Sequence, residues 1–161
     1  MSPPDAHSLV ASLRDRGLTI ATAESLTGGL VCAALTDVPG ASAVVRGGVV
    51  GYATDAKASV LGVDPDVLGR RGAVDPEVAR QMAEGVCRVL ASDVGVATTG
   101  VAGPDPQDGR PVGTVHLAVS MGGSTRVCSL LLHGDRAAIR RATVVAALDL
   151  VSQVLDDTAE R

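Results

Sequence analysis

Apolar residues in the N-terminal half of the chain switch between the spacing of a helix face and the continuous runs of a buried strand. Ala6, Leu9, Val10 and Leu13 recur at helical spacing, which predicts an amphipathic first helix. Glycines and cap residues separate the segments that follow. The predicted elements are a helix from Asp5 to Gly17, a strand over 18–23, a helix over 30–36 after the glycine pair 28–29, a strand over 48–53, and a helix that Thr54 caps and Gly62 ends.

The C-terminal half continues this alternation and adds a hairpin. The sequence Asp75-Pro76-Glu77 supplies a cap, a first-turn proline and an acid, which together predict a helix start. Helices that alternate with strands and end in a hairpin predict one domain over 1–161 with a mixed sheet between helices. The predicted elements are a helical turn at 64–65, a helix from 75, a strand over 93–98, the loop TGVAGPDPQDGRPVG, strands over 114–121 and 125–132, and a helix from Asp135 to about Leu155.

Composition excludes several classes of protein. The 161 residues include no Trp, no Phe and one Tyr, so the chain cannot build a platform of rings for stacked bases or an aromatic cage. The formal net charge of -4 argues against a large footprint on a nucleic-acid backbone. We therefore expect no nucleic-acid partner, and we expect a core built from Val, Ala and Leu.

The sequence also lacks the signals of membrane, disulfide and zinc proteins. No apolar run approaches the ~20 residues that cross a bilayer, and MSPPDAHSLV has no basic segment followed by an apolar one. We therefore expect a soluble, cytoplasmic protein with no membrane partner. The cysteines lie in apolar contexts typical of small buried side chains, and the histidines have no ligand spacing. These residues are Cys32, Cys87 and Cys128, and His7, His116 and His133.

Ser25 lies in the connection between the strand over 18–23 and the helix opened by glycine. A side chain at such a connection is exposed at the sheet edge, and the N–H groups of the helix start point at anything bound there. Ser25 can therefore be a nucleophile. Alternatively, Ser25 and Thr27 simply cap the helix, a role in which serine and threonine are common.

Lys57 is the only lysine among the 14 lysine and arginine residues. Arginine keeps its proton in proteins whereas a desolvated lysine can lose it, so arginine cannot replace lysine as a general base. Lys57 also follows Thr54 closely, and near the first turn of a helix the macrodipole lowers the pKa of a cation. The alternative is compositional drift that left one lysine at an arbitrary position.

Tyr52, the only aromatic residue, precedes Lys57 by five positions. The intervening turn can bring its hydroxyl beside the amine to orient it or relay a proton, unless Tyr52 is an ordinary half-buried tyrosine. With Ser25, these residues form a candidate set for acyl transfer by a serine nucleophile and a lysine base. A short-chain dehydrogenase needs a different Tyr–Lys spacing and a dinucleotide-binding glycine motif, and a P-loop needs Gly-Lys. Neither pattern is present.

Several motifs in register carry a family resemblance. In chain order they are ATAESLTGG, DVPGAS, GYATDAK, ASVLGV, RGAVDPEVARQMAEG, TTGVAGP, RPVGTVHLA and HGDRAAIRRATVVAAL. Together they resemble the CinA C-terminal domain family over most of the chain, from Leu9 to Leu150. The resemblance implies a three-layer α/β/α sandwich with a mixed, mainly parallel sheet that includes a C-terminal β-hairpin.

The resemblance also implies an activity, namely hydrolysis of the carboxamide of nicotinamide mononucleotide to nicotinate mononucleotide and ammonia. It places the nucleophile on Ser25 and the family's tyrosine and lysine on Tyr52 and Lys57. It implies no metal or organic cofactor, a small nucleotide as partner, and a homodimer. Glycines and a helix start suit the ribose phosphate. The candidate substrate-binding residues are Glu24, which can instead hold the loop, and Thr27, Gly28, Gly29, Thr99, Gly100 and Gly103.

Some positions depart from the family pattern. Leu26 stands where cysteine is frequent, and Gly48 and Val49 stand where an aromatic residue is common. The pyridine ring must then be held by aliphatic side chains or backbone. We interpret Asp135 as a helix cap and Arg136 as its structural neighbour. Two alternatives to the activity stay open: a non-catalytic nucleotide-binding or regulatory module of this family, and an amidase for a different small amide.

Overall fold

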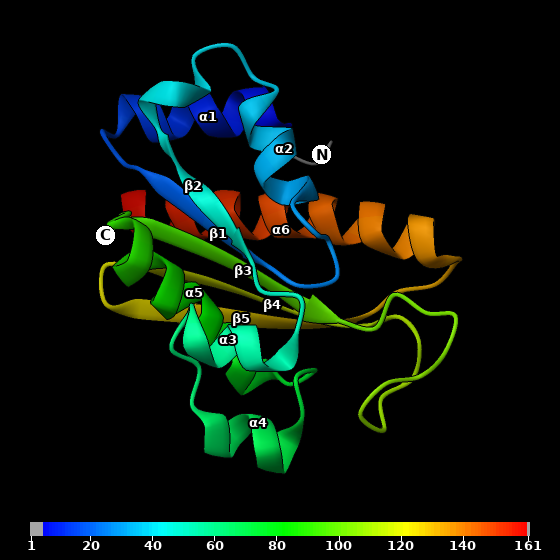
Figure 1. Cartoon of the computed structure of the whole chain (residues 1–161). Coiled ribbons are helices and arrows are strands. Elements are labelled where there is room, and N and C mark those ends of the chain that lie inside the picture. The colour runs from blue at the N-terminus through cyan, green and yellow to red at the C-terminus, as the bar shows by residue number, and fades with distance from the viewer. Residues whose placement is uncertain (1–4, 161) are drawn as a thin grey trace.

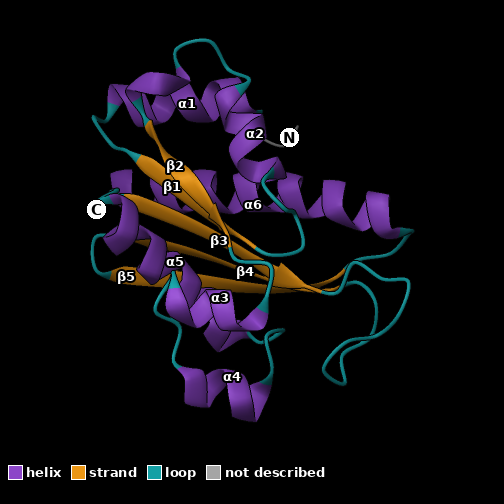
Figure 2. Ribbon diagram, viewed as in Figure 1, coloured by secondary structure: helices purple, strands orange, loops and turns teal. Residues whose placement is uncertain are grey.

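A single five-stranded sheet lies between two layers of helices in the computed structural model, which describes residues 5–160 (Figures 1 and 2). The elements in chain order are α1 (Ala6–Asp15), β1 (Ile20–Glu24), α2 (Leu30–Thr36), the 3-10 turn η1 (Ala41–Ala43), β2 (Val45–Val50), α3 (Thr54–Ser59), α4 (Pro65–Arg71), α5 (Pro76–Leu90), β3 (Val94–Gly100), β4 (Thr114–Met121), β5 (Ser124–Leu131) and α6 (Arg136–Ala159).

The sheet is mixed, with strand order β2-β1-β3-β4-β5. Strand β1 pairs in parallel with both β2 and β3, whereas β4 runs antiparallel to β3 and β5. Four strands therefore point the same way, and β4 alone is reversed. The expected α/β architecture with a mixed sheet, a C-terminal hairpin and helices on both faces is confirmed.

Small residues line the face of the sheet that packs against α5. Ala21, Ala23 and Ala97 are fully buried on this face. A Cβ added to Gly95 would lie only 2.3 Å from the carbonyl oxygen of Ala83 on α5. Because no large ring separates them, the helix and the central strands approach closely, and this replaces the aromatic core that the composition lacks.

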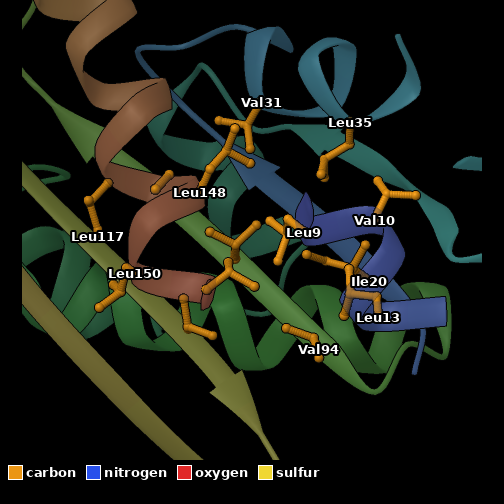
Figure 3. Close-up of a cluster of buried hydrophobic side chains, with 14 of the residues drawn as sticks. Leu9, Val10, Leu13, Ile20, Val31, Leu35, Val94, Leu117, Leu148 and Leu150 are labelled. Carbon is orange, nitrogen blue, oxygen red and sulfur yellow. The ribbon is translucent and has the colours of Figure 1, made fainter. Parts of the chain in front are cut away.

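The opposite face carries the larger apolar core, between the sheet and α1, α2 and α6 (Figure 3). Strands β1 and β3 are buried along their lengths, which is typical of central strands covered on both faces. The residues labelled in this core are Leu9, Val10, Leu13, Ile20, Val31, Leu35, Val94, Leu117, Leu148 and Leu150.

The carboxyl ends of β1 and β3 meet the long loop over 101–113 and the start of α6 at one edge of the sheet (Figure 1). The chain leaves β1 through α2 toward β2 on one side, and β3 lies on the other side. Such a change of direction is where open α/β sheets form their binding crevices. The topology therefore predicts a binding crevice at the segments that follow β1 and β3.

Several predicted boundaries need correction. The second strand spans Val45–Val50, not 48–53, because this edge strand alternates in burial and contains two glycines that hide its apolar pattern. Thr54 does not cap α3: the cap position is Ala53, which makes no side-chain cap bond. The expected turn at 64–65 is the seven-residue helix α4, and α6 extends to Ala159.

Within residues 5–160, none of the helices is both long and apolar enough to span a bilayer.

Replacing Gly85 with alanine tests the close packing that seats the segment after α3. A Cβ on Gly85 would lie 1.9 Å from the carbonyl oxygen of Leu61, so Gly85→Ala should lower the free energy of unfolding by roughly 1–3 kcal/mol. Gly69→Ala is the matched control, because a Cβ there meets nothing within 4 Å and should stabilise α4 by up to about 1 kcal/mol. Urea unfolding measures the free energy of unfolding of both variants. If Gly85→Ala stabilised the protein as much as Gly69→Ala, the packing argument would be contradicted.

Candidate active site

Ser25 and Lys57 lie side by side although 31 residues separate them in the chain. Ser25 directly follows β1, and its backbone N–H donates to the carbonyl oxygen of Thr98 at 3.0 Å, which continues the pairing of β1 with β3. Lys57 lies on α3, and its Nζ is 3.0 Å from Ser25 Oγ. The two residues are 1% (Lys57) and 8% (Ser25) exposed. The fold therefore forms the Ser–Lys pair in a place that is nearly closed to water.

The amine of Lys57 is oriented by two backbone carbonyl groups. Its Nζ lies 2.8 Å from the carbonyl oxygen of Gly51 and 3.2 Å from that of Tyr52. A neutral amine has two hydrogens and one lone pair. When both hydrogens are donated to these carbonyls, the lone pair is left for the hydroxyl of Ser25, which is the arrangement that a general base requires.

Burial lowers the pKa of Lys57 to about 8, and the negative charge of Asp108 opposes this shift. The expectation that the helix dipole lowers the pKa of Lys57 is wrong, because α3 has only six residues and Lys57 lies in its last turn. At pH 7 roughly one tenth of the amine is then neutral, against about one part in several thousand at an ordinary lysine pKa.

The side chain of Tyr52 does not lie where we expected it. The Tyr52 group that contacts the amine is its backbone carbonyl. Its side chain is exposed, and its hydroxyl accepts a hydrogen bond of 3.1 Å from Arg136. The expected orientation of Lys57 by the phenol is therefore wrong, because the two groups leave the backbone in different directions. A contact between the phenol and a substrate stays a prediction.

Glu24 holds the start of α2. Its carboxylate is 1% exposed and accepts hydrogen bonds from the backbone N–H groups of Val31 at 2.8 Å and Cys32 at 3.0 Å. The hydroxyl of Thr22 donates to the same carboxylate at 3.1 Å. Of the two roles considered for Glu24, the structure places it in the loop-holding one, and the proposed contact with substrate is wrong for this buried side chain.

The first N–H groups of α2 already donate to acceptors within the protein, so the start of this helix is not available to bind an anion. Glu24 accepts from Val31 and Cys32, and the N–H of Leu30 donates to the carbonyl oxygen of Thr27. Thr27 is fully buried, and its hydroxyl contacts that of Thr98 at 2.8 Å. The helix-start argument for phosphate binding at 27–29 is therefore wrong, and a contact of Gly28 or Gly29 with substrate stays a prediction without that support.

A small cavity of about 130 Å³ opens beside Ser25. Three predicted binding residues line it, namely Thr99, Gly100 and Gly103, whereas Glu24, Thr27, Gly28 and Gly29 do not. The other lining residues come from the turn after β1, from the segments before α3 and α5, from the long loop and from the start of α6: Leu26, Tyr52, Ala73, Val74, Val101, Ala102, Asp105, Gln107 and Arg136.

Two arginines of α6 reach the site, and neither was predicted from the sequence to be a site residue. Arg136 donates to the carbonyl oxygen of Gly103 at 2.7 Å and to the Tyr52 hydroxyl. Arg140 donates to the backbone after Ser25. Asp135 caps α6, as expected. The i, i+4 spacing of the two arginines after this cap was the available signal, since it places both on one side of the helix.

A larger hollow of about 460 Å³ lies at the opposite edge of the sheet. Arg126 and Asp157 line it and form an ion pair at 2.6 Å. It is remote from Ser25 and Lys57, so its size does not make it the reactive site. Within the described residues, no three His, Cys, Asp or Glu side chains gather as metal ligands would.

Fold and site together define an α/β domain with a buried Ser–Lys pair at the carboxyl edge of its parallel strands. The chain belongs to the CinA C-terminal domain family, whose model matches residues 4–155. This confirms the resemblance that the sequence motifs carry.

Curated relatives extend beyond the length of this chain. A "CinA-like protein" of Frankia casuarinae is 53% identical over 143 residues, which cover 89% of this chain and 33% of the relative. A "Putative competence-damage inducible protein" of Acetivibrio thermocellus is 49% identical over 140 residues, which cover 86% of this chain and 34% of the relative. The chain thus spans about a third of the length of these relatives.

Solved structures match the whole fold. The competence damage-inducible protein A (ComA) of Klebsiella pneumoniae has a TM-score of 0.89 and 33% identity, covering 95% of this chain and 98% of that one. The competence/damage inducible protein CihA of Agrobacterium tumefaciens has a TM-score of 0.88 and 39% identity, covering 97% and 98%. These two structures share the α/β arrangement described here.

Replacing Glu24 with glutamine tests its structural role. The amide offers one oxygen in place of two, and its NH₂ group would face a backbone N–H, so one buried donor loses its acceptor. Glu24→Gln should lower the free energy of unfolding by about 1–3 kcal/mol. Urea unfolding measures this, with exposed Glu160→Gln as the control that changes nothing. Unchanged stability in Glu24→Gln would rule out the capping role.

Proposed function

We propose that this chain hydrolyses the carboxamide of nicotinamide mononucleotide to nicotinate mononucleotide and ammonia. The single observation that carries the proposal of hydrolysis is the 3.0 Å contact between Lys57 Nζ and Ser25 Oγ in a buried site. A lysine of lowered pKa beside a serine is a known way to activate the hydroxyl without histidine. The choice of substrate comes from the family resemblance.

In the proposed reaction, neutral Lys57 takes the proton of Ser25 while Oγ attacks the amide carbon. The carbon–nitrogen bond then breaks, and the departing ammonia receives the proton from Lys57. Water attacks the resulting ester with Lys57 again as base, which releases the carboxylate product and restores Ser25. The hydroxyl of Tyr52, which lines the cavity, is a candidate contact for the leaving ammonia.

The cation and the backbone groups that line the cavity suit a nucleotide. Arg136 lines the cavity and is exposed, and a guanidinium group binds phosphate through paired N–H donors. Gly100 and Gly103 permit close approach of the substrate to the backbone, and Thr99 lines the cavity beside them. The cavity contains no aromatic ring other than that of Tyr52, so aliphatic side chains and peptide groups must hold the pyridine.

Ammonia release from nicotinamide mononucleotide tests the proposal directly. Purified wild-type protein should release ammonia, and Ser25→Ala and Lys57→Arg should each reduce the rate by on the order of 10²–10⁴-fold, because one removes the nucleophile and the other the base. Exposed Ser42→Ala is the control and should retain the wild-type rate. Circular dichroism confirms that each variant folds.

The outcomes separate substrate from mechanism. Folded wild-type protein that binds the nucleotide without releasing ammonia would indicate the non-catalytic module instead. Full activity in Lys57→Arg would reject the lysine base while leaving the substrate in place, because a guanidinium cannot take the proton.

The dependence of the rate on pH tests the role of Lys57 as the base. Neutral amine is the active form, so kcat/KM should rise about tenfold per pH unit and level off above about pH 8. Asp108→Asn removes the negative charge that favours the ammonium, which lowers the pKa of Lys57 further and moves the rise to lower pH. The asparagine oxygen can still accept from the N–H of Ala73, as Asp108 does at 3.1 Å.

Asp66→Asn, an exposed carboxylate on α4, is the control and should leave the profile in place. A profile that stays fixed in Asp108→Asn, or moves to higher pH, would contradict the electrostatic argument.

A further inference from the structure

Helix α6 holds the backbone that follows Ser25 through one guanidinium group. Arg140 Nε donates to the carbonyl oxygen of Leu26 at 2.9 Å, and its Nη2 donates to that of Thr27 at 3.2 Å. The side chain comes from a residue more than a hundred positions away in the sequence. Nothing in the reaction proposed above assigns a task to Arg140.

These two bonds complete a tight turn. The N–H of Gly28 donates to the carbonyl oxygen of Ser25 at 3.1 Å, and the turn needs a positive φ of 57° at Gly28. Three successive carbonyl groups, those of residues 25–27, therefore have fixed directions. Because a trans peptide is planar, fixing each carbonyl also fixes the N–H of the next residue in the opposite direction.

Two of the N–H groups fixed in this way have no acceptor. Within residues 5–160, neither the amide of Leu26 nor that of Thr27 donates to a hydrogen bond. Leu26 lines the cavity together with Ser25, whereas Thr27 is fully buried and does not line it. The amide that follows a nucleophile is well placed to stabilise a developing oxyanion, provided that it cannot rotate away.

Arginine suits this task better than lysine. A planar guanidinium presents two N–H donors at a fixed spacing, which matches two successive carbonyl oxygens, whereas an ammonium offers one nitrogen. Its charge also polarises the peptide groups that it binds, and this strengthens the N–H donors on their other side. Arg136, one turn earlier on α6, binds Gly103 on the other wall of the cavity. One helix thus fixes both walls relative to each other.

We infer that Arg140 is a positioning residue for the amide of Leu26 as the oxyanion-binding group of Ser25. Its bond to the carbonyl oxygen of Thr27 directs the N–H of Gly28 at the carbonyl oxygen of Ser25, and this fixes the N–H of Leu26 in the opposite direction. This inference rests on the proposed function only in assigning Ser25 as the nucleophile. Arg140 itself contacts neither substrate nor the reacting atoms. Its effect is expected in the chemical step and not in substrate binding.

The test compares Arg140→Met and Arg140→Lys with Arg141→Met, an exposed neighbour on the same helix whose side chain makes no hydrogen bond within residues 5–160. In Arg140→Met, kcat for nicotinamide mononucleotide should fall by on the order of 10²-fold with KM within about threefold, as for loss of an oxyanion donor. Arg140→Lys should recover part of the loss, and methylguanidinium should partly restore kcat in Arg140→Ala. Arg141→Met should match wild type.

A second readout is independent of the substrate. A fluorophosphonate labels an activated serine and places its own oxygen where the oxyanion would lie, so intact-mass spectrometry follows the labelling rate of Ser25. This rate should fall in Arg140→Met by about the same factor as kcat. Amide hydrogen exchange at Gly28, whose N–H donates to the carbonyl oxygen of Ser25, should accelerate in the same variant.

The outcomes are distinguishable. If wild type labels at Ser25 but releases no ammonia from nicotinamide mononucleotide, and Arg140→Met slows the labelling, then the substrate is wrong and Arg140 keeps its role. Wild-type kcat and labelling rate in Arg140→Met would overturn the inference. A rise in KM alone would also overturn it, because it would place Arg140 in binding. Wild-type protein that neither labels nor turns over would overturn both proposals.

Discussion

The ammonium group of Lys57 has almost no contact with water, and the geometry of the site follows from that constraint. A buried amine needs an acceptor for each of its hydrogens, and the carbonyl groups of Gly51 and Tyr52 supply two. These carbonyls belong to the short connection between β2 and α3, so the connection and the lysine fix each other. Ser25 then becomes the third neighbour, because β1 ends directly beside this connection.

Close packing makes this arrangement possible. Alanines and glycines on one face of β1 and β3 let α5 lie against the sheet, and Gly85 lets α5 approach the segment just after α3. A bulkier face would move that segment, and Lys57 with it, away from the end of β1. The shortage of aromatic residues thus does more than exclude classes of partner. It allows the close packing of α5 on the sheet, and this packing positions Lys57.

The sequence predicted the fold class and the pair at the centre of the site. Lys57 was found because every other basic position except histidine is arginine, and Ser25 because it follows a strand and precedes a glycine pair. The helix dipole was the wrong reason for a low pKa, since the length of α3 and the burial of Lys57 depend on tertiary packing. The phenol of Tyr52 was assigned the contact that its backbone carbonyl makes, because spacing along a chain does not determine side-chain direction.

The arginines of α6 were missed for the opposite reason. In a chain that uses arginine at almost every cationic position, one more arginine carries no compositional signal. They bind the backbone carbonyls of Gly103, Leu26 and Thr27. Because every residue has a backbone carbonyl, the type of residue at these positions does not reveal the contact. Only the fold, which carries α6 back to the ends of β1 and β3, brings these groups together.

A second buried base, His116, bears on how the titration of the site is to be interpreted. It lies on β4 opposite Thr99 in β3, its Nδ1 contacts the hydroxyl of Ser129 at 2.8 Å, and burial lowers its pKa below the ordinary histidine value. Histidine would therefore lose its proton at a lower pH than Lys57, and its ring is bonded toward β5, away from Ser25. Burial also raises the pKa of the Cys32 thiol above its ordinary value. An ionisation observed near pH 8 is thus assigned by both geometry and energy to Lys57, the one of these three groups that touches Ser25.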